Sequence, residues 1–442
     1  MSDHESILAN LPDDWTEATI EDLGAVVSGG TPSREIASFW GGTIPWVTPG
    51  EVTTLKRKTL RLTNESITDE GLRQSGANLL PIGSLLITTR ASLGYCVINS
   101  VPVTTNQGFK SIVFRQSSNP DFYYHWARKV STELKRRASG TTFLEISGSD
   151  FKQIKLPVPP SAEQQKIAQI LDTLDTQIQK IEALIAKLDK IKEGLLRDLL
   201  TRGIDQNGLL RPTPEQAPEF YKESALGLIP MEWEAMRLKS VTRIAHGYAF
   251  SGSAFTDKPT GPVLLTPGNF HRNGGLYFTE RNTKWYSGKV PVGYTLSPGD
   301  IVTVMTDLSP QTLILGMTTV VQKGHELLHN QRIGKIVLSN PKRWCSMFLS
   351  AQMSSFKFRS RVIAKATGTT VRHTSPEKIL SEYVLVPGIE EQTETSRIIA
   401  THEQRISEEK NVAKKLLAHK HGLMNDLLTG RVRVTPLLKD AV

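Results

Sequence analysis

The 442-residue sequence contains the same set of motifs twice, in the same order. LPDDW at residues 11–15 returns as IPMEW at 229–233, and WVTPG at 46–50 returns as LLTPG at 264–268, with the same spacing between the two copies. Self-similarity over such a distance is typical of a duplicated structural unit. We therefore expect the chain to fold as two similar halves.

Further paired motifs extend the duplication to the end of the chain. They are 106–107 with 330–331 (NQ), 138–142 with 366–370 (ASGTT and ATGTT), 158–159 with 386–387 (VP), 163–164 with 391–392 (EQ) and 198–201 with 426–429 (DLLT). The spacing between the copies grows only within the first section of each copy, where loops accept insertions. Because the order never changes, both copies should have the same plan.

Each copy begins with a section that carries mixed strand and helix signals. LLIT at 85–88 and IVTV at 301–304 each follow a Pro/Gly turn, which is typical of short strands. NPD at 119–121 indicates the start of a helix. We predict a mixed α/β (α+β) globular domain with a small sheet at residues 1–160, and a second one at 230–388.

Each copy ends in one long helix with a coiled-coil seam. Apolar residues recur every three or four positions over 161–202 and, less regularly, over 389–430, which predicts that each helix packs against another. If the halves are related by a two-fold axis, the helices pair as an antiparallel coiled coil with pseudo-two-fold symmetry. The predicted pairing residues are Leu171, Leu174, Ile178, Ile181, Ile185, Leu188, Ile399, Ile406, Leu416 and Leu423.

Two lysines, Lys192 and Lys420, occupy equivalent positions in the two seams. A lysine there can fix the register of a coiled coil at a cost in stability; alternatively, both lie on a frayed or solvent-facing stretch. Residues 203–229 contain an Asn-Gly pair and three prolines, which predicts an irregular linker, and 431–442 form a tail.

The composition favours a polyanionic partner. The formal net charge is +9 and the isoelectric point is about 9.3. Only Cys96 and Cys345 are present, which favours a reducing cytoplasm and leaves no thiolate zinc site. The acidic start is unlike a secretory signal, and no apolar run is long enough to span a bilayer. We expect a cytoplasmic protein without a membrane segment.

These motifs resemble the specificity subunits of type I restriction–modification systems over nearly the whole chain. The segments that carry the resemblance are 11–15 (LPDDW), 29–32 (GGTP), 81–87 (PIGSLLI), 106–108 (NQG), 156–160 (LPVPP) with 163–164 (EQ), and 423–431 (LMNDLLTGR). The second copy departs from the pattern at one loop, where GGTP is replaced by GYAF at 247–250.

The resemblance implies two target-recognition domains, each reading one half of a split double-stranded DNA site. It implies that the long helices set the spacer and dock two adenine methyltransferase subunits, which restriction–translocation subunits join. S-adenosylmethionine, ATP and Mg²⁺ would then belong to the partner subunits. This chain is expected to carry no catalytic residue, no metal and no cofactor.

DNA-contact candidates fall into shared and divergent positions. Shared amides such as Asn106 and Asn330 could pair with adenine, but they are also typical of turns. The paired threonines could meet phosphate or could cap a helix. Divergent polar positions are the candidates for base readout. The predicted contacts are Thr31, Ser33, Arg34, Lys56, Arg57, Arg90, Ser92, Asn106, Gln107, Lys110, Thr141, Thr142, His246, Tyr248, His271, Arg272, Asp307, Gln311, Asn330, Gln331, Arg332, Thr369 and Thr370.

Two patterns suggest catalysis. HELLH at 325–329 matches a zinc-protease motif that requires a helix and a third ligand, but the first copy has VPVTT at 101–105 instead. Asp121 and Glu133 suggest a carboxylate pair, but the second copy has Arg361 at the position of Glu133. A metal-dependent hydrolase that uses HELLH and a coiled-coil adaptor without DNA binding remain as alternatives.

Overall fold

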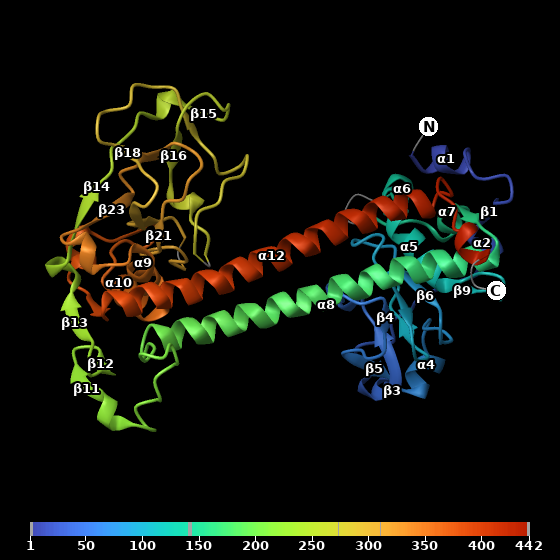
Figure 1. The fold of residues 1–442 in the computed structure, drawn as a ribbon. Coiled ribbons are helices and arrows are strands. Elements are labelled where there is room, and N and C mark those ends of the chain that lie inside the picture. The colour runs from blue at the N-terminus through green and yellow to red at the C-terminus, as the bar shows by residue number, and fades with distance from the viewer. Residues whose placement is uncertain (1–2, 140–143, 273, 310, 440–442) are drawn as a thin grey trace. The chain divides into compact units, whose positions relative to one another are not determined.

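The computed structural model describes residues 3–139, 144–272, 274–309 and 311–439 (Figure 1). The chain divides into two compact units: unit 1 is Met1–Ala183 with Lys410–Val442, and unit 2 is Leu184–Glu409. Helices α8 (Ser161–Leu199) and α12 (Ile389–Leu427) each contribute to both units. Each unit therefore combines one globular section with half of each long helix. Both helices end slightly before the predicted boundaries at 202 and 430.

The globular section of unit 1 is built on a five-stranded sheet of order β2-β9-β6-β7-β4. Neighbouring strands are antiparallel except β4 and β7, which are parallel. The strands are β2 (Gly24–Ser28), β4 (Thr59–Leu60), β6 (Leu85–Thr88), β7 (Cys96–Asn99) and β9 (Phe109–Phe114). The predicted strand at 85–88 is confirmed, and all four of its residues are buried because the sheet is covered on both faces.

Smaller elements complete unit 1. A second sheet has the order β5-β3-β8, and a β1–β10 pair joins the first and last strands of the globular section. These strands are β1 (Thr16–Thr19), β3 (Trp40–Val47), β5 (Glu65–Ile67), β8 (Thr104–Thr105) and β10 (Lys155–Val158). The helices are α1 (Asp3–Leu8), α2 (Ile20–Leu23), η1 (Ala37–Phe39), α3 (Pro49–Thr54), α4 (Asp69–Arg73), α5 (Pro120–Lys129), α6 (Ser131–Arg137), α7 (Gly148–Lys152) and α13 (Pro436–Lys439).

Helix α5 joins the sheet of unit 1 to the long helices. The predicted helix start is confirmed: the Asn119 side chain accepts hydrogen bonds from the backbone N–H groups of Asp121 and Phe122, at 2.9 and 3.3 Å. Trp126 is fully buried, and its indole N–H donates to the Leu428 carbonyl at 3.1 Å, just beyond α12. The start of the chain and its C-terminal part thus share one core.

Unit 2 repeats the main sheet with strand order β14-β23-β19-β21, all antiparallel. These strands are β14 (Thr242–His246), β19 (Ile301–Val304), β21 (Thr318–Val320) and β23 (Ile333–Leu338). A second sheet, of order β15-β17-β16-β22-β18, consists of β15 (Phe255–Thr256), β16 (Val263–Leu265), β17 (Trp285–Tyr286), β18 (Thr295–Leu296) and β22 (Leu327–His329). The predicted strand at 301–304 is confirmed.

The remaining elements of unit 2 are two strand pairs, a hairpin and short helices. The pairs are β13 (Glu234–Arg237) with β25 (Tyr383–Val386), and β20 (Thr306–Asp307) with β24 (Arg372–His373). The helices are η2 (Pro218–Phe220), η3 (Leu238–Ser240), η4 (Gly252–Ala254), η5 (Pro267–Asn269), η6 (Pro341–Arg343), α9 (Ser346–Ser354), α10 (Phe356–Ala364) and α11 (Pro376–Leu380). The prediction of a wholly irregular linker is wrong, because β11 (Tyr221–Ser224) and β12 (Gly227–Pro230) form a hairpin there.

The long helices pack together in an antiparallel sense within each unit (Figure 1). In unit 1, Leu171 of α8 shares a core with Leu427 of α12. In unit 2, Leu199 of α8 packs with Ile399 of α12. The start of α8 thus meets the end of α12, and the end of α8 meets the start of α12. All the predicted pairing residues are buried or half-buried.

The two seam lysines form ion pairs across the helix pair. Lys420 is 6% exposed and pairs with Asp175 in unit 1. Lys192 Nζ lies 2.6 Å from Glu403 Oε1 in unit 2. Since each ammonium meets a carboxylate of the opposite helix, a frayed or solvent-facing position is excluded for both. Within the ranges given above, no helix combines the length and the apolar character needed to cross a membrane.

Candidate nucleic-acid interface

Four loops of unit 1 meet at one edge of the five-stranded sheet. Because β2 and β6 both run antiparallel to β9, their C-terminal ends lie beside the start of β9. Backbone hydrogen bonds join the loops: Gly30 N–H donates to Thr105, Thr89 N–H donates to Gly108, and Ile146 N–H donates to Thr89, at 2.8, 2.8 and 3.1 Å. We call this group edge 1; its loops are 29–34, 89–92, 106–108 and 144–146.

The shared Asn-Gln pair of edge 1 closes a turn and supports a neighbouring loop. Asn106 Oδ1 accepts from the backbone N–H of Gly108 at 2.9 Å. The Gln107 side chain accepts a hydrogen bond from the Thr31 hydroxyl. The turn role that the sequence suggested for Asn106 is therefore what the structure shows. Thr31 and Gln107 remain exposed.

Two cations of edge 1 approach the same carboxylate. Lys110 Nζ and Arg90 Nε lie 3.7 and 3.5 Å from the carboxylate oxygens of Glu145. Lys110 is only 6% exposed, so its predicted contact with DNA is corrected to a role inside the domain. Its position on β9 faces the packed side of the sheet, which the sequence did not reveal. Arg90 remains exposed and Ser92 half-exposed.

Arg34 is the most firmly held exposed cation of edge 1. Its guanidinium carbon lies 3.8 Å from the ring centroid of Trp40 and 5.0 Å from that of Trp46. It also forms a two-point ion pair with Glu65, in which Nη2 lies 2.9 Å from Oε2. Hydrogen bonding from Arg34 lowers the pKa of the Glu65 carboxyl. The side chain of Arg34 is 53% exposed, and neighbouring Ser33 is exposed too.

The predicted basic pair Lys56 and Arg57 lies against the long helix instead of joining edge 1. The Lys56 carbonyl accepts from the Gln179 side chain of α8 at 3.3 Å. The next residue, Lys58, pairs with Asp172 of α8 and Asp121 of α5, at 2.5 and 2.6 Å. Both predicted cations are exposed.

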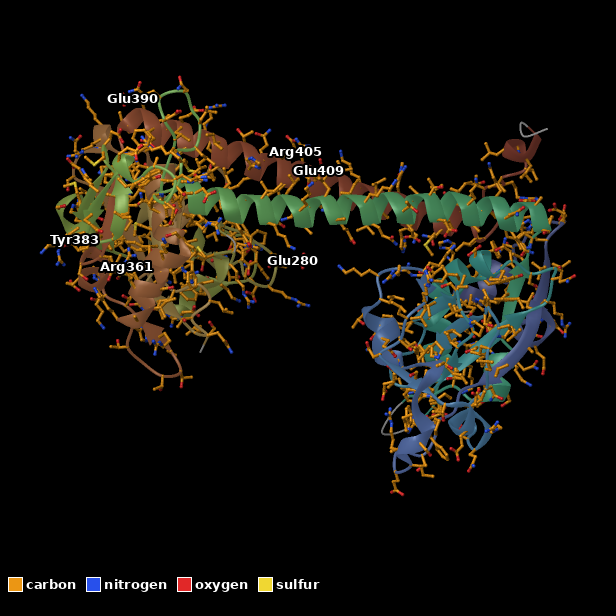
Figure 2. The ribbon with its side chains drawn as sticks, turned by 90° about the horizontal axis from the view of Figure 1, so that it is seen from below. Glu280, Arg361, Tyr383, Glu390, Arg405 and Glu409 are labelled. Carbon is orange, nitrogen blue, oxygen red and sulfur yellow. The ribbon has the colours of Figure 1, made fainter. Side chains whose placement is uncertain are left out.

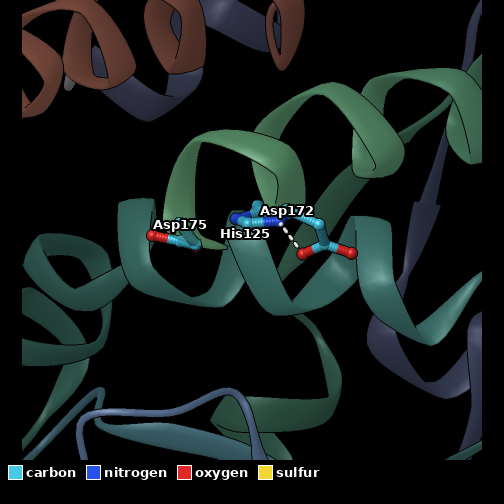
Figure 3. A group of neighbouring side chains, drawn as sticks. All are labelled: His125, Asp172 and Asp175. Carbon is cyan, nitrogen blue, oxygen red and sulfur yellow. Dashed lines mark hydrogen bonds and ion pairs between the residues drawn. The ribbon is translucent and has the colours of Figure 1, made fainter. Parts of the chain in front are cut away.

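A compact polar cluster next to this segment has the residue types of a metal site (Figure 3). Ligand atoms of His125, Asp172 and Asp175 all lie within 4.8 Å of one another. However, each carboxylate already has an ammonium partner, Lys58 on Asp172 and Lys420 on Asp175. His125 Nε2 lies 3.0 Å from Asp172 Oδ1, whereas Asp175 points away from that pair.

The polar cluster therefore joins α5, α8 and α12 of unit 1 by ion pairs. Burial lowers the pKa of His125, which favours a neutral ring beside the charged pairs. The sequence analysis missed these residues, because their partners come from four distant segments and share no local spacing.

Unit 2 builds an equivalent group of loops, edge 2, at 247–250, 305–309 with 311–312, 330–332 and 367–374. Tyr248 N–H donates to the His329 carbonyl and Gln331 N–H donates to Tyr248, at 2.8 and 3.0 Å. Asn330 Oδ1 accepts from Arg332 N–H at 2.9 Å, as Asn106 does for Gly108 in unit 1. The two shared asparagines thus close equivalent turns, while Gln331 and Arg332 are exposed.

The buried side chain of Asp307 holds a loop of edge 2 in place through hydrogen bonds from the backbone. It is 2% exposed and accepts from the backbone N–H groups of Ser309, Ile314 and Leu315, at 2.8, 2.7 and 3.1 Å. Its predicted contact with DNA is therefore corrected to a structural role. Gln311 lies exposed in the same loop.

The other predicted contacts of unit 2 lie on exposed loops. Tyr248 is 41% exposed and packs on Phe250 and Tyr294, with ring centroids 5.2 Å apart in both pairs. His246, at the end of β14, is exposed. His271 and Arg272 are exposed on the separate loop that follows η5.

The threonine pair of unit 2, Thr369 and Thr370, does not cap a helix. Thr369 and Thr370 are exposed in a turn closed by hydrogen bonds between Thr367 and His373. The following helix, α11, is capped by Ser375. The helix-cap interpretation is wrong for this pair, because the turn ends before the helix begins. Their counterparts Thr141 and Thr142 lie outside the described residues.

The two catalytic patterns have structural roles. Residues 327–329 form strand β22, and His329 is 3% exposed with Nε2 2.8 Å from the Ile333 carbonyl. His325 packs instead on Phe278 and Trp285, at centroid distances of 5.0 and 5.5 Å. Without a helix, HELLH cannot direct both imidazoles to one metal.

The carboxylate pair is also excluded. Asp121 is bound by Lys58, and Glu133 is 3% exposed and held by Arg136 and Arg137 at 2.7 and 2.6 Å. Hydrogen bonds from these arginines lower the pKa of Glu133 to about 2. Both carboxylates are thus neutralised separately by cations, which is unlike a metal-binding pair.

A family model described as "type I restriction modification DNA specificity domain" matches residues 12–190, which contain edge 1 and most of α8. Residues 12–190 of the chain are thus similar to that domain, and curated specificity subunits of type I restriction enzymes are similar to longer parts of the chain. The MjaIX specificity subunit of Methanocaldococcus jannaschii is 32% identical over 246 residues, 55% of each chain. The MjaVIII specificity subunit of the same organism is 24% identical over 97% of this chain and 95% of its own.

Solved structures of specificity subunits share the fold. The S subunit from M. genitalium aligns with a TM-score of 0.57 at 14% identity, over 95% of this chain and 96% of its own chain. A chain from a structural study of the assembly and conformational transition of a type I system aligns with a TM-score of 0.56, also at 14% identity. The alignment covers 96% of this chain and 100% of that chain.

Proposed function

We propose that this chain is a specificity subunit that reads a bipartite double-stranded DNA site, with edge 1 reading one half-site and edge 2 reading the other. The observation that carries the proposal is the duplication of one loop framework with different residues on it. Asn106 and Asn330 close the same turn in both units, whereas the adjoining loops present Arg34 in unit 1 and Tyr248 in unit 2. A shared scaffold with divergent polar loops suits two half-sites of different sequence.

The remaining candidates, which are exposed or half-exposed, divide between the units. The base and phosphate contacts that we propose are Thr31, Ser33, Arg34, Arg90, Ser92 and Gln107 on edge 1, and His246, Tyr248, Gln311, Gln331, Arg332, Thr369 and Thr370 on edge 2. Lys56, Arg57, His271 and Arg272 lie on other exposed loops, and we assign them to phosphate. Net positive charge supports such contacts.

We further propose that the chain is not itself a catalyst and directs partner subunits. The family indicates two adenine methyltransferase subunits, which the paired α8 and α12 would dock, and restriction–translocation subunits that join them. S-adenosylmethionine, ATP and Mg²⁺ would be bound by those partners. Two free cysteines support a reducing, cytoplasmic location. A coiled-coil adaptor without DNA binding would leave the divergent exposed loops unexplained.

Deleting the gene tests this proposal. We expect methylome sequencing of the host to show the loss of one bipartite methyladenine motif, two short fixed sequences separated by an unspecified spacer. A plasmid copy of the wild-type gene should restore that motif, and all other methylated motifs should persist. If every methyladenine motif survives the deletion in a host that expresses the partner methyltransferase, the proposed function is wrong.

A further inference from the structure

We propose that Arg34 reads a guanine in the half-site recognised by unit 1. This inference rests on the function proposed above, and it adds the chemical identity of one base and the side chain that reads it. Three features of the structure carry it: a fixed loop, a fixed guanidinium plane and free hydrogen-bond donors on that plane.

The loop that carries Arg34 is held by two tryptophans. The Trp46 indole N–H donates to the Gly30 carbonyl, and the Trp40 indole N–H donates to the Ser33 carbonyl, both at 3.0 Å. At Gly29, an added Cβ would lie 1.9 Å from the Asn106 carbonyl oxygen. The glycine therefore allows the loop to pack against the Asn-Gln turn. This leaves the backbone before Arg34 little freedom to move.

The guanidinium plane is fixed as well. It stacks on Trp40 at 3.8 Å, and Glu65 holds both terminal nitrogens in a two-point ion pair. This pair uses two of the five N–H groups of an arginine. The other three, including that on Nε, have no hydrogen-bond partner among the described residues, and the side chain is 53% exposed. Donors thus remain on a plane whose orientation is already set.

A fixed plane with free donors suits guanine better than phosphate. Guanine offers O6 and N7 in the major groove, and the commonest specific contact is a two-point pair with arginine. A phosphate contact does not require a fixed plane, because a mobile lysine also binds phosphate, as a point charge. Holding the side chain in place before binding reduces the entropy lost on DNA binding. At the corresponding motif unit 2 has residues 247–250 (GYAF), without an arginine.

Two substitutions separate base reading from charge. Arg34→Lys and Arg34→Ala are introduced into the full chain, which is co-expressed with its methyltransferase subunits, and methylome sequencing is performed. The half-site of unit 1 should contain a G·C pair at which discrimination falls about tenfold to hundredfold in both variants. The second half-site and the spacer should be unchanged. Exposed Arg61 provides a matched control, and Arg61→Ala should keep the complete motif.

Several outcomes would overturn the assignment to guanine. One is a unit 1 half-site without a G·C pair. Another is that Arg34→Ala weakens methylation equally for every base at that position, whereas Arg34→Lys does not. That result would indicate a phosphate contact. A third is an unchanged motif in both variants, whose folding is checked by thermal unfolding. If the wild-type chain directs no bipartite methylation at all, the proposed function itself fails.

Discussion

Replacing Arg433 with methionine should destabilise unit 1 by about 2–4 kcal/mol. Arg433 lies in the C-terminal tail, and its Nε lies 3.0 Å from the Glu163 carboxylate at the start of α8. Its terminal nitrogens also pair with Asp14, at 2.7 and 2.8 Å, beside the Trp15 ring. Glu163 is 1% exposed, so removing the guanidinium leaves a buried carboxylate without its cation. We place the loss below that of fully buried pairs because Arg433 is 27% exposed.

Hydrogen exchange followed by mass spectrometry measures this effect unit by unit. Backbone amides of β1 and of the first turns of α8 should exchange faster in Arg433→Met, whereas those of unit 2 should keep their protection. Arg431 provides a control two residues away, because its pair with Asp426 is at the surface and its side chain is 73% exposed. Arg431→Met should change stability by less than about 1 kcal/mol. Equal effects of the two substitutions would contradict this account of the tail.

Replacing Glu391 with alanine should destabilise unit 2 by about 3–5 kcal/mol. Glu391 stands at the start of α12, where Glu163 stands in α8. It accepts hydrogen bonds from Arg211 Nη2, the Trp233 indole N–H and the Ile204 backbone N–H, at 3.1, 3.0 and 2.9 Å. Arg211 is 12% exposed and Trp233 fully buried. Removing the Glu391 carboxylate therefore leaves the buried Arg211 guanidinium with only the Arg202 carbonyl at 3.0 Å and the Glu232 carboxylate at 3.7 Å, and it leaves the Trp233 and Ile204 donors without this acceptor.

The neighbouring Glu390 offers a matched control for this prediction. It is exposed in the first turn of α12, so its carboxylate meets water and the helix N-terminus (Figure 2). Glu390→Ala should cost about 0.3–1 kcal/mol. In hydrogen exchange, Glu391→Ala should reduce protection in β12 and β13 while unit 1 stays protected. A loss of protection confined to unit 1, or equal effects of both substitutions, would show that the contact does not hold unit 2 together.

The duplication made much of the architecture predictable. It indicated two globular sections and two long helices, and it argued against a HELLH metal site because the first copy has no matching ligands. Burial of single polar residues was less predictable. The sequence predicts Lys110 and Asp307 as DNA contacts, but sheet register and loop closure place both inside their domains. The sequence carries no signal for such long-range contacts.

The paired EQ motif shows the same limit. Its recurrence at 163–164 and 391–392 was visible in the sequence, but its role was not. In the structure, Glu163 at the start of α8 pairs with Arg433, which follows α12. Glu391 at the start of α12 pairs with Arg211, which follows α8. Each arginine is separated in the sequence from its glutamate by more than the length of one globular section. Only the packing of the two long helices brings them together.

Exchanging one globular section tests most directly the claim that each unit reads its own half-site. Residues 20–154 would be replaced by those of a relative with a different target, which keeps the β1–β10 pair and both long helices intact. Methylome sequencing should then show one new half-site, with the other half-site and the spacer length unchanged. A change in both half-sites, or in neither while methylation continues, would contradict the two-reader account.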